Sequence, residues 1–171
     1  MDQQTQPLTP PDSHHLNAAV GWLGLGNYLA ANEELERIEA RLRAHPDVLQ
    51  TRCHVCVLAK QWDAVLAIAE VLVKIVPERP SVWIDRSNAL HFLGRYSEAY
   101  DKLTPALKLF PDNWLFPYNL ACFCSRMGKL DDSRQLLAKA IELDKQHEVK
   151  LRALDDPDLE PLWKEIGNLD E

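Results

Sequence analysis

Apolar residues recur at helical spacing along most of the chain, and short polar breaks interrupt them. In the stretch 80–113, one apolar stripe contains Trp83 and Leu90, and a second contains Ala99 and Leu103. Spacings of four and seven residues place each pair on one face of a helix, so the stretch predicts two short amphipathic helices in a hairpin. A single hairpin is too small to bury both of its faces, so it needs similar neighbours.

The hairpin pattern returns at a shift of 34 residues without an insertion. The position of the turn between the two helices is occupied in succession by Gly26, Lys60, Gly94 and Gly128. A large residue follows two places later in each copy, as Tyr28, Trp62, Tyr96 and Leu130. The register predicts four repeats, which span 12–45, 46–79, 80–113 and 114–147.

The two ends of the chain depart from this register. Residues 1–11 are rich in Gln, Pro and Thr, and we expect a disordered lead-in there. Residues 148–171 are expected to form capping helices and a tail, in which Leu159, Leu162, Trp163 and Ile166 cover the exposed end of the fourth repeat.

The period, together with Trp83, Gly94, Tyr96, Ala99 and Pro111 at their spacing, resembles the tetratricopeptide repeat. Small residues in these columns suit two helices that cross about 8–10 Å apart. The resemblance implies an all-α fold, namely a right-handed superhelical solenoid of helix-turn-helix repeats with a C-terminal capping helix. It also implies a non-catalytic scaffold that binds an extended peptide or a helix of another protein in a concave groove.

The resemblance assigns the groove to columns on the first helix of each repeat. The partner-binding residues predicted in this way are Gln50, His54, Ile84, Asn88, His91, Phe92, Tyr118, Cys122 and Arg126. Relatives that grip a terminal carboxylate carry cations where this chain has Ile84, Asp85 and Leu115, so that activity is not supported. A self-associating protein and a chaperone for one specific partner stay open as alternatives.

The net charge and the hydropathy of the chain indicate which classes of binding partner to expect. The net charge is −7 and Lys and Arg are not clustered, which opposes nucleic-acid binding and makes a cationic peptide the easier partner. We expect no membrane contact, because no apolar run is as long as a membrane span. The N-terminus lacks the pattern of a signal peptide, so a cytoplasmic location with four free thiols is expected.

The cysteines form two close pairs. Cys53 and Cys56, with Cys122 and Cys124, have spacings that suggest zinc or redox chemistry. The pairs lie on equivalent helices two repeats apart, and Cys122 and Cys124 point to nearly opposite sides of theirs, so no joint site is expected. Cys53 and Cys56 are predicted to be buried, whereas Cys122 falls on the groove side as a candidate reactive thiol.

Other side chains with potential chemistry have simpler interpretations. The acidic residues Asp155, Asp156, Asp158 and Glu160 lie near a predicted helix N-terminus, where the helix dipole favours negative charge, and we prefer capping to a metal site. The histidines show no spacing typical of a triad or a metal site, and no glycine-rich phosphate loop is present. The sequence therefore predicts no cofactor, no metal and no enzymatic activity.

Three local features of the sequence predict the backbone conformation at particular residues. Lys60 replaces the turn glycine, so its turn is expected to form without a left-handed residue. Pro105 lies inside a helical pattern and predicts a kink. A continuous helix is expected over 27–42.

Overall fold

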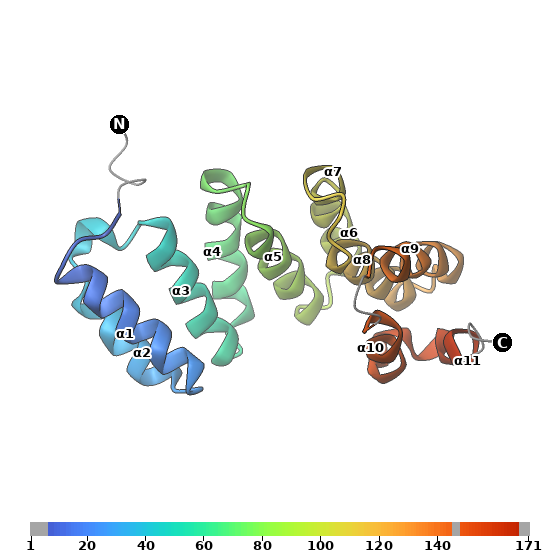
Figure 1. Cartoon of the computed structure of the whole chain (residues 1–171), viewed down its shortest axis with the longest axis horizontal. Coiled ribbons are helices and arrows are strands. Elements are labelled where there is room, and N and C mark those ends of the chain that lie inside the picture. The colour runs from blue at the N-terminus through green and yellow to red at the C-terminus, as the bar shows by residue number, and fades with distance from the viewer. Residues whose placement is uncertain (1–6, 145–147, 168–171) are drawn as a thin grey trace. The chain divides into compact units, whose positions relative to one another are not determined.

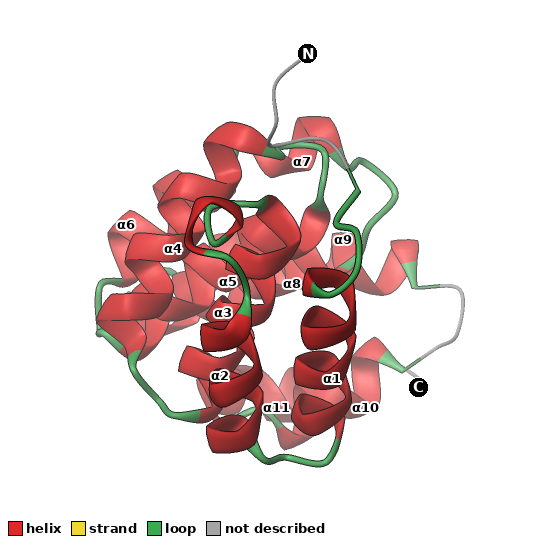
Figure 2. Ribbon diagram, turned by 90° about the vertical axis from the view of Figure 1, so that its left-hand side faces the viewer, coloured by secondary structure: helices red, strands yellow, loops and turns green. Residues whose placement is uncertain are grey.

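The computed structural model describes residues 7–144 and 148–167, and the regular structure of this part of the chain is entirely helical (Figures 1 and 2). The chain divides into two compact units, residues 1–89 and 90–171. Residues 1–6 of the predicted lead-in, 145–147 of the predicted fourth repeat and 168–171 of the predicted tail lie outside the described residues. Leu8, which belongs to the predicted lead-in, packs against the core of the first unit.

The first unit is built from helical hairpins. Its elements are α1 (Asp12–Gly24), α2 (Tyr28–Arg37), the 3₁₀ helix η2 (Ala40–Leu42), α3 (Pro46–Leu58), α4 (Trp62–Ile75) and most of α5 (Pro80–Phe92). Helix α1 pairs with α2, α3 pairs with α4, and α3 also packs against the first pair (Figure 1). Ala19 and Ala31 are fully buried in the first hairpin, and their small side chains let the helices approach closely.

The second unit repeats this construction. Its elements after α5 are α6 (Tyr96–Leu103), α7 (Ala106–Leu109), α8 (Leu115–Arg126), α9 (Leu130–Leu143), α10 (Val149–Asp155), η3 (Pro157–Leu162) and α11 (Trp163–Gly167). Helix α8 pairs with α9 and also contacts α6 and α7. Small side chains again mark the close approach, since Ser133 on α9 donates a 2.7 Å hydrogen bond to the Ala121 carbonyl on α8.

Four turns that join the helix pairs have the same backbone geometry. A residue with positive φ follows each first helix, at 73° for Gly26, 56° for Lys60, 73° for Gly94 and 75° for Gly128. At the second turn, the amide of Gln61 donates to the carbonyl of Cys56 at 2.9 Å, as in a Schellman motif. The prediction for Lys60 was therefore wrong, because a lysine adopts the left-handed conformation that glycine has in the other turns.

Two predicted helices are interrupted. The helix expected over 27–42 ends at Arg37, because Ile38 is extended with ψ 135°, and only the short η2 follows. At Pro105 the helical hydrogen-bond pattern is interrupted between α6, which ends at Leu103, and α7, which begins at Ala106, although Thr104 and Pro105 keep right-handed helical torsion angles. Proline has no amide hydrogen for the helical ladder, and its ring crowds the preceding turn.

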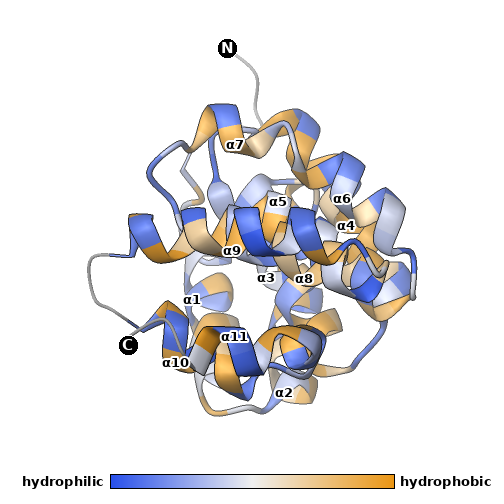
Figure 3. Ribbon diagram, turned by 90° about the vertical axis from the view of Figure 1, so that its right-hand side faces the viewer, coloured by the Kyte–Doolittle hydropathy of each residue, from blue (hydrophilic) through white to orange (hydrophobic). Residues whose placement is uncertain are grey.

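The C-terminal elements α10, η3 and α11 pack together as a cap on α8 and α9. Apolar and polar residues alternate around these helices in Figure 3, as expected for amphipathic elements. Leu159, Leu162 and Ile166 are buried, and the Trp163 indole donates to the Ala153 carbonyl at 3.0 Å. Of the four apolar residues predicted to cover the last hairpin, these three thus lie in the interior of the cap, and Trp163 is half-buried. Within the described ranges, no helix is both long and apolar enough to cross a membrane.

Candidate functional site

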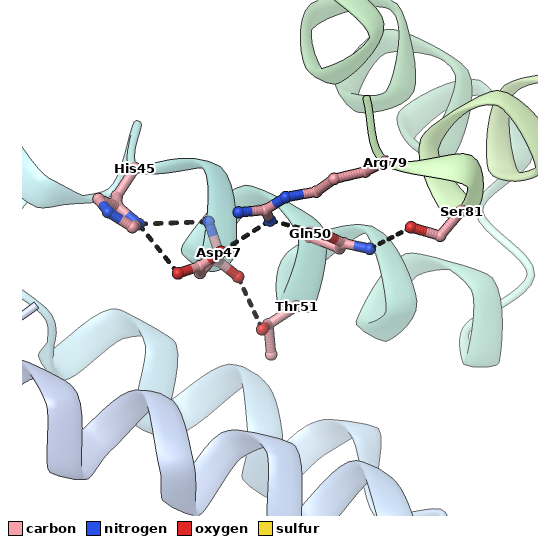
Figure 4. Close-up of polar contacts among 6 residues, drawn as sticks. All are labelled: His45, Asp47, Gln50, Thr51, Arg79 and Ser81. Atoms are coloured by element: carbon pink, nitrogen blue, oxygen red, sulfur yellow. Dashed lines mark hydrogen bonds and ion pairs between the residues drawn. The ribbon is translucent and has the colours of Figure 1, made fainter. Parts of the chain in front are cut away.

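Gln50, the first of the predicted groove residues, uses its amide inside the chain. Its Nε2 donates to Ser81 Oγ at 2.6 Å, and its Oε1 accepts from Arg79 Nη1 at 3.0 Å. The same Arg79 nitrogen lies 2.7 Å from Asp47 Oδ1. Figure 4 shows this network running from the start of α3 to the start of α5. Gln50 therefore positions α5 beside α3, and its amide is not free to bind a partner.

The next predicted residue, His54, remains open to solvent. Its side chain is 47% exposed, and its Nε2 lies 3.7 Å from Oδ2 of Asp85, whose side chain is only 15% exposed. The polar contact with Asp85 raises the pKa of His54, against the opposing effect of partial burial. An imidazole and a carboxylate from neighbouring helices thus meet at the surface of the first unit.

Three further side chains complete a surface that we call the α3/α5 face, defined as His54, Leu58, Ile84, Asp85 and Asn88. Leu58 lies one helical turn beyond His54 on α3 and is exposed. Ile84 and Asn88 are one turn apart on α5 and are partly exposed. Residues four apart lie on the same side of a helix, so apolar and hydrogen-bonding groups alternate along this face.

Tyr118 and Cys122 occupy predicted groove columns on α8, but the cap covers them. The Tyr118 hydroxyl donates to Asp156 Oδ2 at 2.7 Å, and Cys122 Sγ lies 3.7 Å from the same oxygen. The two residues are only 2% and 5% exposed. Burial, reinforced by the Asp156 carboxylate, raises the pKa of both groups. Cys122 is therefore a poor nucleophile, which contradicts the expectation of a reactive thiol.

Two of the remaining predicted residues, His91 and Arg126, lie beside Asp158 in the cap. His91 Nε2 lies 3.3 Å and Arg126 Nε 3.6 Å from the carboxylate oxygens of Asp158. Arg126 also donates to the Tyr96 hydroxyl at 3.0 Å. Burial raises the pKa of Asp158, and the nearby His91 opposes this effect. Phe92, the last of the predicted residues, is 58% exposed.

Cys122, Asp156 and Asp158 have ligand atoms within 4.8 Å of one another, the kind of grouping that can hold a metal ion. Tyr118 already donates to Asp156, and Arg126 lies beside Asp158. These protein groups supply the donors and the positive charge that the carboxylates require. We therefore assign the cluster to attachment of the cap.

Cysteine and arginine side chains in the first unit have structural roles. Cys53 and Cys56 are free and buried, as the sequence predicted. Arg52 pairs with Glu36 at 2.9 Å. The Arg86 guanidinium lies 4.9 Å from the centre of the Trp83 ring, within the range of a cation–π contact.

Residues 93–154 match the family model described as "Tetratricopeptide repeat". The chain contains a tetratricopeptide repeat and has the fold of that family. Solved structures of the same fold include TTC0263 from Thermus thermophilus, with 20% identity, a TM-score of 0.71, and coverage of 93% of this chain and 84% of that one. MamA from Desulfovibrio magneticus RS-1 has 15% identity, the same TM-score, and coverage of 96% and 97%.

A third structure with a tetratricopeptide fold is YrrB, described as a TPR protein with an unusual peptide-binding site. It has 18% identity and a TM-score of 0.71, and the alignment covers 85% of this chain and 75% of YrrB. At these identities the three structures establish the shared fold. The comparison with curated proteins gave no match.

Proposed function

We propose that this tetratricopeptide-repeat protein is a non-catalytic interaction module of the cytoplasm that binds an extended peptide or a helix of a partner protein on the α3/α5 face. One contrast carries the proposal. His54 is exposed on this face, whereas Cys122, in the equivalent column of α8, is covered by the cap, as is Tyr118 one helical turn before it. A binding surface must be accessible, so we assign partner binding to the first unit.

The chemistry of the face suits a peptide. Leu58 and Ile84 offer apolar contact area, while His54, Asp85 and Asn88 offer donors and acceptors for a main chain or a polar side chain. The solved structure of YrrB, whose description includes a peptide-binding site, gives this use a precedent in the same fold. Tetratricopeptide repeats are generally non-catalytic, which supports a binding role without chemistry.

The test compares two matched sites on the first unit. Leu58 on α3 and Val71 on α4 are both 45% exposed, but only Leu58 belongs to the α3/α5 face. Wild type, Leu58→Ala/Asn88→Ala and Val71→Ala are immobilised and incubated with a native lysate of the source cells, after circular dichroism has shown equal helix content. We expect wild type and Val71→Ala to retain the same partner and the α3/α5 variant to lose it. Retention by all three proteins would place binding elsewhere.

Self-association is a second candidate, because one observation favours it. The first hairpin exposes a group of large apolar side chains, namely Val20, Trp22, Leu25 and Leu29. Apolar groups gathered on a surface often mark protein contacts. If a second copy binds there, the mass measured by light scattering rises with concentration for wild type and stays monomeric for Leu25→Ser/Leu29→Ser. A constant monomeric mass for wild type would exclude this candidate.

A further inference from the structure

Asp85 carries a carboxylate oxygen that the folded chain leaves unsatisfied. Its Oδ2 is buried, yet it accepts no hydrogen bond from residues 7–144 or 148–167. The His54 imidazole is 3.7 Å away, which is beyond hydrogen-bonding distance. Buried polar atoms are nearly always paired in native proteins, because a missing hydrogen bond leaves their desolvation uncompensated.

The arginines at equivalent positions of α3 and α5, Arg52 and Arg86, contact groups other than Asp85. Arg86, which follows Asp85 in sequence, lies over the Trp83 ring, and Arg52 pairs with Glu36. The charge of Asp85 acts on two neighbouring groups, the His54 imidazole and the Cys53 thiol. It contributes to raising the pKa of His54, and after the larger effect of burial it also raises the pKa of the Cys53 thiol. Both directions are those expected beside a negative charge.

The residues around Asp85 indicate which kind of donor group from a partner would satisfy its carboxylate oxygen. The Asp85 side chain is 15% exposed although its Oδ2 is covered, and the 47% exposed side chain of His54 lies beside that oxygen. A donor from a partner therefore reaches Oδ2 when the His54 side chain moves aside. Ile84 precedes it and is partly exposed, which provides an apolar surface for an aliphatic side-chain stem. A long cationic side chain meets all of these conditions, since its stem packs on apolar groups and its head donates to a carboxylate.

We infer that Asp85 is the specificity-determining residue of the α3/α5 face and that it binds a lysine or arginine side chain of the partner peptide. This inference rests on the proposed function, because it names the chemistry of the peptide that the face takes. Asp85 supplies the charged acceptor. Leu58 and Ile84 pack against apolar residues of the peptide on either side of the cation.

A random linear peptide library displayed on phage is the probe. It is selected in parallel on wild type, on Asp85→Asn and on Glu33→Gln. The control removes one negative charge from an exposed position on α2. We expect wild type and Glu33→Gln to enrich peptides with lysine or arginine at a fixed distance from an apolar residue. Asp85→Asn is expected to enrich apolar residues without that cation.

A second measurement changes the peptide as well as the protein, so that its comparison of two peptides on wild type does not depend on how the variant folds. The strongest selected peptide and a copy with norleucine in place of its lysine are titrated into wild type and into Asp85→Asn by calorimetry. Loss of the ammonium group should weaken binding to wild type about ten- to hundredfold and leave binding to Asp85→Asn nearly unchanged.

The outcomes separate the two proposals. If no protein selects any peptide, the α3/α5 face is not a peptide site, and both the proposed function and this inference fail. If wild type selects peptides without a basic preference, or if Asp85→Asn keeps the same preference, the face binds peptides but Asp85 does not read a cation. Either of these two results overturns the inference alone.

Discussion

The substitution Leu159→Ala in the cap should expose Cys122 without unfolding the first unit. Leu159 is fully buried on η3, and η3 packs on α8, which carries Cys122. Replacing a buried leucine by alanine costs about 2–5 kcal/mol, because apolar contacts are lost and a cavity is left. If Cys122 reacts only when the cap opens, the substitution lowers the free energy of cap opening by the same amount. The labelling rate of Cys122 should then rise about thirtyfold to several thousandfold.

The assay is thiol labelling of the native protein, resolved by residue with peptide mass spectrometry. Cys53 is the internal control, since it is fully buried in the other compact unit. Leu159→Met is the matched variant, because it keeps nearly the same apolar volume and should label like wild type. Equal acceleration of Cys53 and Cys122 in Leu159→Ala would mean global unfolding. Rapid labelling of Cys122 in wild type would mean that the cap does not protect it, and either result would refute the reasoning.

Three smaller predictions concern single groups. Lys60→Gly should raise the free energy of unfolding by about 0.5–1 kcal/mol in urea titrations, while Lys60→Ala should not, because alanine keeps the strained left-handed Cβ. The pKa of the His54 imidazole, measured by NMR, should lie above the ordinary histidine value in wild type and should fall in Asp85→Asn. Because the folded-state pKa of His54 is raised, its contribution to stability is fully present below the unfolded-state pKa and is lost as pH rises through the folded-state pKa. The melting temperature of wild type should therefore exceed that of Asp85→Asn by less as the pH is raised through this range. Tyr118→Phe should lower the free energy of unfolding in urea by about 1–2 kcal/mol, since Oδ2 of Asp156 loses its hydroxyl donor and retains the weaker contact with Cys122.

The repeat period could be read from the sequence because it reflects helix packing that every copy must satisfy. Small residues at Ala19, Ala31, Ala121 and Ser133 are fully buried where paired helices meet. The turn at Lys60 shows the limit of residue propensity. The hydrogen bond from Gln61 to Cys56 closes the turn as it does in the other copies, so the shared geometry outweighs the cost of a left-handed lysine.

The candidate site was less predictable, because helix position says where a side chain points but not what covers it. Tyr118 and Cys122 fall in the right columns, yet Asp156 reaches them from 38 and 34 positions further along the chain. The acidic cluster was the available signal. One oxygen of Asp156 does cap η3, accepting from the Asp158 amide at 3.0 Å, and the other binds Tyr118. The unsatisfied oxygen of Asp85 has no signature in the sequence, since it depends on the absence of a donor in three dimensions.

The most direct test of the α3/α5 face is site-specific photocrosslinking to the partner retained from lysate. The photoreactive residue benzoylphenylalanine replaces either Leu58 on the face or Val71 on α4, two positions with equal exposure. The account predicts that the Leu58 position crosslinks to one continuous segment of the partner that contains a lysine or arginine, and that the Val71 position gives no crosslink. Crosslinks from the Val71 position alone, or crosslinks that join two copies of this chain, would contradict it.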